Sequence, residues 1–189
     1  MTSVIDQIDR ALTMTGLVVQ GLTGDRLAAP ALCPAWDVRT ELNHLVGGMR
    51  IFAAELTGTD AGAAHEDDWL GDDPRAAFAL ADSLDRDAWH RPGALDGTVR
   101  LGFGELPGPM AALVHLTEVL VHGTGLALAT GQEALADDAA CDELLTIMLA
   151  MDFAAFRRPG MFGPEVPADP ADPAHRRLLA FTGRRLPSR

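Results

Sequence analysis

The sequence predicts an all-α protein, a four-helix bundle with an irregular C-terminal tail. Apolar residues recur at the i, i+3, i+4, i+7 spacing of core-facing helices over several long stretches. Gly, Pro and Asp residues stand where these stretches begin and end, as expected of helix boundaries. Facing helices of such a bundle commonly build cofactor and metal sites from their side chains.

The first two helices are expected over residues 4–22 and from residue 38 to residues 57–58. The first follows an approximately helical period of apolar residues, which Gly21 and Gly24 break. The second begins after Asp37, a good N-cap residue. Its apolar stripe consists of Val38, Leu42, Leu45, Val46, Met49, Phe52, Ala53 and Leu56.

A third helix is predicted from Pro74 to about Trp89, because proline suits the first turn of a helix. The acidic, Gly- and Ala-rich stretch over residues 59–73 reads as an exposed connection before it. Residues 97–104 show a weak alternation of apolar and other residues and are flanked by glycines. This pattern is compatible with a short strand or hairpin.

The long apolar helix that follows is expected from Pro107-Gly108-Pro109 to about Gly131. Another helix is expected to start at Asp137 and Asp138 and to be closed by residues 157–160. Its predicted buried face contains Leu144, Leu145, Met148, Met151 and Phe156. Residues 160–189 form the extended tail, with a short helical turn around residues 176–182, packed on one domain that spans residues 1–189.

Composition excludes several classes of partner. The 189-residue chain carries a net charge of -12, which disfavours an electrostatic grip on nucleic acid or an anionic membrane. No run of about 18 uninterrupted apolar residues predicts a membrane span, and the acidic N-terminus does not resemble a signal peptide. We therefore expect a cytoplasmic protein that acts on a small molecule. Cys33 and Cys141 form no CxxC pair and are expected to be buried free thiols.

His115, Glu118 and His122 form one stripe of the long apolar helix. Burying such groups costs several kcal/mol, roughly, unless each is hydrogen-bonded, ion-paired or metal-bound. Glu118 and His122, at i and i+4, can share one metal ion, whereas His115 is better placed as a second-shell partner or proton relay. A third ligand must come from another helix, and His44 is the best candidate. A buried hydrogen-bonded network and a metal-free acid–base pair are the alternatives.

His44 falls away from the aliphatic stripe of its helix, on the side of Gly47, Gly48 and Ile51. It either faces solvent, or the two glycines leave room beside the imidazole for a ligand or a close helix. The spacing His-x-x-Glu-x-x-x-His is not the His-Glu-x-x-His of zincins, so it does not indicate a metalloprotease. Cys33 has no neighbouring base in the sequence that would activate it as a reactive thiol. The tryptophans Trp36, Trp69 and Trp89 are expected to be packing anchors.

Three segments resemble a known family: residues 33–48, residues 118–131, and residues 162–166 with 178–184. Together they are similar to the DinB-like superfamily, in particular to its actinobacterial branch related to the N-terminal domain of mycothiol-dependent maleylpyruvate isomerase. The resemblance implies a four-helix bundle that holds a divalent metal, zinc or another first-row ion such as nickel, with His44, Glu118 and His122. It also implies a low-molecular-weight thiol such as mycothiol as co-substrate.

The chain departs from this family at Thr124-Gly125, where relatives often carry Trp-Asp, and we expect its 189 residues not to include the isomerase's second domain. We therefore expect a metal-dependent thiol S-transferase or isomerase, but not maleylpyruvate isomerisation itself. A non-catalytic metal-binding or stress-associated bundle and a small-molecule carrier are the alternative functions. A homodimer formed through an outer helix face is compatible with this fold.

Overall fold

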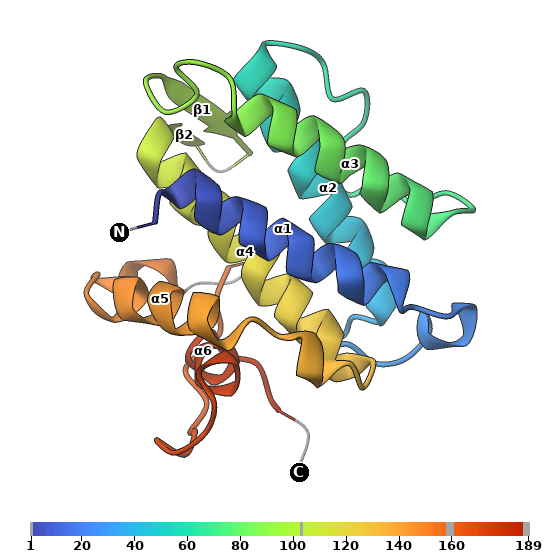
Figure 1. Cartoon of the computed structure of the whole chain (residues 1–189), viewed down its shortest axis with the longest axis vertical. Helices are drawn as coiled ribbons and strands as arrows, with labels where there is room; N and C mark the ends of the chain where they lie inside the picture. The colour runs from blue at the N-terminus through green and yellow to red at the C-terminus, as the bar shows by residue number, and fades with distance from the viewer. Residues whose placement is uncertain (1, 103, 158–160, 187–189) are drawn as a thin grey trace.

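The computed structural model describes residues 2–102, 104–157 and 161–186, which are mostly helical (Figure 1). The α-helices are α1 (Val4–Gln20), α2 (Val38–Thr57), α3 (Pro74–Trp89), α4 (Gly108–Ala129), α5 (Asp138–Leu149) and α6 (Ala174–Phe181). The strands β1 (Thr98–Leu101) and β2 (Gly104–Pro107) form an antiparallel hairpin in which Val99 pairs with Leu106. The predicted all-α class with one short hairpin is therefore confirmed.

Local sequence signals account for the helix boundaries. Asp37 accepts a hydrogen bond from the backbone N–H of Thr40 at 2.7 Å and so caps α2. Gly58 ends the same helix in the left-handed conformation, with φ at 69°, which glycine adopts at little cost. Asp73 caps α3, and Pro74 occupies its first turn. The starts of α2 and α3 therefore lie where the sequence predicts them.

Helices α1 to α4 pack on one another around a shared apolar core (Figure 1). Helix α1 lies along α4, while α2 contacts both α3 and α4. The most apolar stretch of α4 has a mean hydropathy of 1.4, which by length and composition would suffice to cross a membrane. However, 83% of that stretch is buried inside the molecule, so α4 packs as a core helix.

Helix α5 is shorter than the sequence predicts. It ends at Leu149, so Met151 and Phe156 do not belong to its buried face, and residues 153–156 form a separate 3-10 turn. The break allows the Phe153 ring to pack against Phe162 and Phe181, with ring centroids 5.0 and 4.9 Å away. Aromatic packing against the C-terminal segment replaces further turns of helix. Of the predicted stop at 157–160, only residue 157 lies within the described part of the chain.

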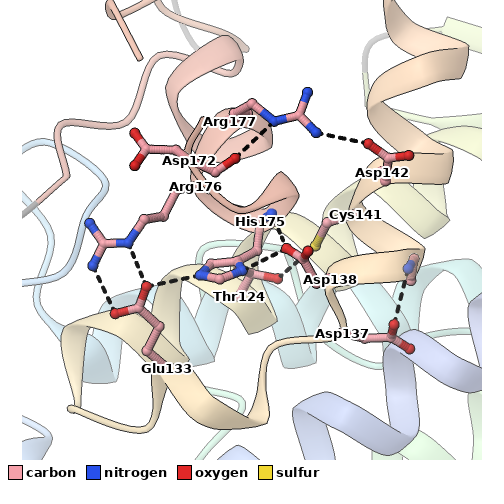
Figure 2. Close-up of polar contacts among 11 residues, drawn as sticks. Thr124, Glu133, Asp137, Asp138, Cys141, Asp142, Asp172, His175, Arg176 and Arg177 are labelled. Carbon is pink, nitrogen blue, oxygen red and sulfur yellow. Dashed lines mark hydrogen bonds and ion pairs between the residues drawn. The ribbon is translucent and has the colours of Figure 1, made fainter. Parts of the chain in front are cut away.

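The C-terminal helix α6 packs on α5 and is held by charged contacts (Figure 2). Glu133 accepts hydrogen bonds from Arg176 at 2.5 and 2.8 Å, and the hydrogen bonds from Arg176 lower the pKa of Glu133 to about 2. His175 bridges Glu133 and Asp138, with each ring nitrogen 2.9 Å from a carboxylate oxygen. The tail therefore contains an eight-residue helix, longer than the predicted turn, that is fixed to the segments preceding it.

Candidate metal centre

His44, Glu118 and His122 come together although α2 and α4 are far apart in sequence. Glu118 Oε2 lies 3.1 Å from His44 Nε2 and 3.3 Å from His122 Nε2. The three potential ligand atoms all lie within 4.8 Å of one another. Because Glu118 and His122 are one helical turn apart, α4 presents both on one face, and the packing of α2 supplies the third.

The three side chains differ in exposure in a way that leaves one side of the cluster accessible. The His44 and Glu118 side chains are 29% and 33% exposed, whereas His122 is 7% exposed. Two imidazoles and a carboxylate are ordinary ligands of zinc and other first-row divalent ions. Three protein ligands with an accessible side match the donor set of a catalytic metal, where a further position stays open for water or substrate.

The electrostatics of the cluster favour opposite charges on His122 and Glu118. Burial alone would lower the pKa of His122, but hydrogen bonds with Cys33, Glu118 and Glu41 raise it well above its ordinary value. Burial would raise the pKa of Glu118, yet the hydrogen bonds from His122 and His44 hold it well below its ordinary value. Burial lowers the pKa of His44. A metal ion entering the site would therefore have to displace a proton from His122 Nε2.

Sequence reasoning missed Glu41. This residue of α2 is fully buried, and its Oε1 lies 2.8 Å from His122 Nδ1. One signal was available: Glu41 lies three residues after Val38, on the buried side of α2, where the other residues are apolar. An acidic residue at such a position needs a partner from another element.

Cys33 also differs from expectation, since it lies beside a base and is only half-buried. Its Sγ is 3.9 Å from His122 Nδ1 and donates to Glu41 Oε1 at 3.4 Å. Residues before α2 thus reach the inner nitrogen of His122, an arrangement set by the turn that precedes the helix. Cys141, in contrast, is the buried free thiol that the sequence predicts.

The Trp36 side chain and the connection between α2 and α3 complete the surroundings of His44. The Trp36 ring centroid lies 5.0 Å from that of His44 and 6.1 Å from that of His122. On another side, His65 donates from Nε2 to the carbonyl oxygen of His44 at 3.0 Å, with the two rings 4.5 Å apart. Trp36 and His65 therefore have a direct role in the structure of the site that the sequence did not suggest.

The space beside Gly47 is used by the connection over residues 59–73 rather than by another helix. A Cβ on Gly47 would lie 2.7 Å from the Trp69 ring and 3.0 Å from His65. Part of this segment, predicted to be an exposed connection, therefore packs on α2 next to His44. The glycines therefore make room for Trp69 and His65 of this connection, and not for the ligand or close helix that the sequence-based interpretation expected beside the His44 imidazole.

His115 belongs to a different cluster. Its Nε2 lies 2.6 Å from Asp85 Oδ2 of α3, and both side chains are almost fully buried, at 1% and 0% exposure. Its ring packs against Phe52 and Trp89, with centroids 4.6 and 5.4 Å away. The predicted second-shell or relay role would require a contact with the ligand residues, whereas these contacts join α4 to α2 and α3. They make His115 half of a buried hydrogen-bonded pair, with Asp85 as its partner rather than Glu118 or a backbone group.

Thr124 and Gly125, which stand where relatives often carry Trp-Asp, each have a defined environment in the structure. Thr124 is buried with its Oγ1 3.7 Å from Cys141 Sγ, on the side of α5. At Gly125, a Cβ would lie 3.1 Å from Glu41 Oε1, which is tighter than normal packing. The absence of a side chain at 125 therefore leaves room for the carboxylate that α2 places against His122.

Comparison with known proteins identifies relatives of this chain. Residues 8–127 match the model of the family described as the mycothiol maleylpyruvate isomerase N-terminal domain. Uncharacterized proteins from two Mycobacterium tuberculosis strains, CDC 1551 / Oshkosh and ATCC 25618 / H37Rv, are each 31% identical over 176 residues. The matches cover 93% of this chain and 94% of each relative. No solved structure matches the chain.

Proposed function

Because the chain belongs to the mycothiol maleylpyruvate isomerase N-terminal domain family of the DinB-like superfamily, we propose that it is a divalent-metal-dependent enzyme acting with a low-molecular-weight thiol. The reaction class is thiol S-transfer or isomerisation, and the thiol is of the mycothiol type. The proposed ligands are His44, Glu118 and His122, and zinc is the expected ion. We also infer the four-helix bundle of the superfamily for α1 to α4, a single domain and a cytoplasmic location.

One observation carries this proposal: three ligand atoms of suitable chemistry lie within 4.8 Å of one another on the accessible side of α2 and α4. A buried His122 alone could be explained as a structural hydrogen-bonding group. The partial exposure of His44 and Glu118 is harder to explain in that way, because exposed partners add little to stability. An open, three-ligand set is instead what a metal that also binds a substrate requires.

The bound ion would supply Lewis acidity, which lowers the pKa of a thiol so that it reacts as a thiolate near neutral pH. The chain itself provides the remaining functions. His44 and Glu118 hold the accessible side, whereas His122 is anchored from the interior by Glu41. Trp36 packs on both imidazoles and limits their movement. Its apolar ring also excludes water from one side of the site.

The first experiment measures metal content of the purified protein by elemental analysis, for the wild type and for His122→Ala. We expect about one divalent ion per chain in the wild type and little in the variant, because two remaining ligands make a weak site. Arg86→Ala removes a side chain that contacts Asp9, Thr13 and Asp82 and leaves all three proposed metal ligands in place, so it serves as a control. Equal metal content in the wild type and His122→Ala would contradict the proposed ligand set.

The second experiment tests catalysis by following loss of a low-molecular-weight thiol in the presence of an epoxide or a maleyl compound. Metal-dependent thiol consumption that disappears in His122→Ala supports the enzyme. Metal binding with neither thiol consumption nor thiol-dependent isomerisation of the maleyl compound would favour the alternative, a non-catalytic metal-binding bundle, because an isomerisation returns the thiol unchanged. Tight retention of a small molecule without turnover would instead indicate a carrier. These outcomes separate the three functions.

A further inference from the structure

His122 lies between two carboxylates, one at each ring nitrogen. Its Nε2 faces Glu118 Oε2 at 3.3 Å, and its Nδ1 faces Glu41 Oε1 at 2.8 Å. If Nε2 binds the metal of the proposed function, Nδ1 must keep its proton and donate it to an acceptor. Glu41 is a buried acceptor in the correct place, and it arises from α2, the same helix that supplies His44.

Three segments of the chain hold the Glu41 carboxylate in position. The Cys33 thiol donates to Glu41 Oε1 at 3.4 Å from the turn before α2. On the α4 side, Gly125 leaves the space that a Cβ, at 3.1 Å from the same oxygen, would restrict. The third segment is α2 itself, whose helical backbone carries Glu41. Together, the three segments restrict the positions that the Glu41 carboxylate can take beside the His122 imidazole.

The arrangement carries an energetic cost that stability alone does not explain. Glu41 is 0% exposed, and its Oε2 has no hydrogen-bonding partner among the described residues. An unsatisfied buried carboxylate oxygen destabilises a protein, so an apolar residue at position 41 would be favoured by core packing alone. A carboxylate that accepts from the far nitrogen of a metal-binding histidine is a recurrent way to fix its tautomer and strengthen its binding.

We propose that Glu41 is a positioning residue that fixes the Nδ1–H tautomer and the ring orientation of His122, with the Cys33 thiol holding the carboxylate in place. This inference rests on the proposed metal site. It assigns Cys33 a role as hydrogen-bond donor to Glu41 rather than as a ligand of that ion. The two ring nitrogens of His122 point in diverging directions, and Cys33 lies at Nδ1, whereas His44 and Glu118 gather at Nε2.

The test compares metal affinity of wild type, Glu41→Gln and Glu55→Gln, measured by competition of the metal-free proteins with a chelator for zinc. Glu55 lies on the exposed side of the same helix, so its variant removes the same charge away from the site. We expect Glu41→Gln to bind zinc about 10- to 100-fold more weakly, and Glu55→Gln to match the wild type. Because a neutral amide keeps nearly the same shape, packing is largely preserved.

A second readout distinguishes positioning from a purely structural role. In the zinc-loaded wild type, nitrogen-15 NMR of the His122 side chain should show a protonated Nδ1 whose hydrogen exchanges slowly with solvent. The exchange should be faster in Glu41→Gln, because the acceptor has lost its charge. Gly125→Ala, which crowds the carboxylate without altering any donor, should weaken zinc binding in the same direction and serves if Glu41→Gln fails to fold.

The outcomes separate this inference from the proposed function. A wild type that binds no zinc overturns both. Normal zinc binding by the wild type with unchanged affinity and exchange in Glu41→Gln overturns the positioning role alone. Cys33, Glu41 and His122 could themselves surround an ion, since their ligand atoms also lie within 4.8 Å. A thiolate charge-transfer band in the cobalt-substituted protein that disappears in Cys33→Ser would place the ion there and would overturn the inference.

Discussion

The buried pair between Asp85 and His115 offers the sharpest test of how this core is built. Its two side chains are 0% and 1% exposed, and they meet at 2.6 Å between α3 and α4. Removing either partner leaves a buried polar group without its main hydrogen bond. We expect Asp85→Ala and His115→Leu each to lower the free energy of unfolding by about 3–5 kcal/mol, the range for breaking a buried pair.

The double variant should lose less than the sum of the single variants. Asp85 Oδ1 and His115 Nδ1 have no hydrogen-bonding partner within the described chain, so the native pair already carries a desolvation cost. The double variant removes the interaction between the two side chains, but it also removes this desolvation cost, which is about 1–3 kcal/mol for each unsatisfied group. The expected coupling between the two sites is therefore about 3 kcal/mol.

Urea unfolding of the metal-free proteins, followed by circular dichroism, measures these differences. Asp87→Ala is the matched control, since Asp87 is an exposed acidic residue two positions away on the same helix. Single variants that stay within about 1 kcal/mol of the wild type would refute the reasoning. Zinc affinity of His115→Leu adds a separate criterion. A large loss of affinity in a folded His115→Leu protein would restore the relay or second-shell role.

Three further predictions concern packing, acid stability and thiol reactivity. Gly123→Ala should lower the free energy of unfolding by about 2 kcal/mol in urea, because its Cβ would overlap the Thr15 hydroxyl between α4 and α1; an unchanged midpoint would contradict this close approach. Glu133→Gln should cost about 1 kcal/mol at neutral pH, a figure reduced for the 37% exposure of the side chain. Since the pKa of Glu133 is depressed to about 2 from 4.5, this contribution is present above pH 4.5 and is lost as the pH falls toward 2, so wild type and variant should converge there in pH-dependent melting. Burial raises the pKa of Cys141 to about 12, so a thiol reagent should label only Cys33 in the native protein and both thiols after unfolding; rapid native labelling of Cys33→Ser would show that Cys141 is accessible.

Much of the helical architecture could be predicted because its signals are local. The apolar period of α2, its Asp37 cap and its Gly58 stop depend on residues within a few positions of one another. The end of α5 could not be predicted in the same way. Its sequence continues with apolar residues, and the helix stops at Leu149 where Phe153 packs instead on Phe162 and Phe181. That choice depends on partners distant in sequence.

The candidate site shows the same division. The i, i+4 spacing of Glu118 and His122 on a helix determines that they share a face, whatever surrounds them. The proximity of His44 to Glu118, in contrast, depends on the packing of α2 on α4. The family resemblance predicted it, and the structure places the two side chains in contact. Glu41 and Cys33 could not be assigned from spacing, since each lies more than 80 positions from His122.

The sequence by itself determined which residues could form helices, which polar groups lay on apolar faces and therefore required partners, and which pair on α4 could share an ion. Tertiary structure alone decided the partners. It divided the stripe of α4, giving His115 to Asp85 of α3 and His122 to Glu41 of α2. The physical reason is that helical period fixes the direction of a side chain, whereas the packing of helices decides what it meets there.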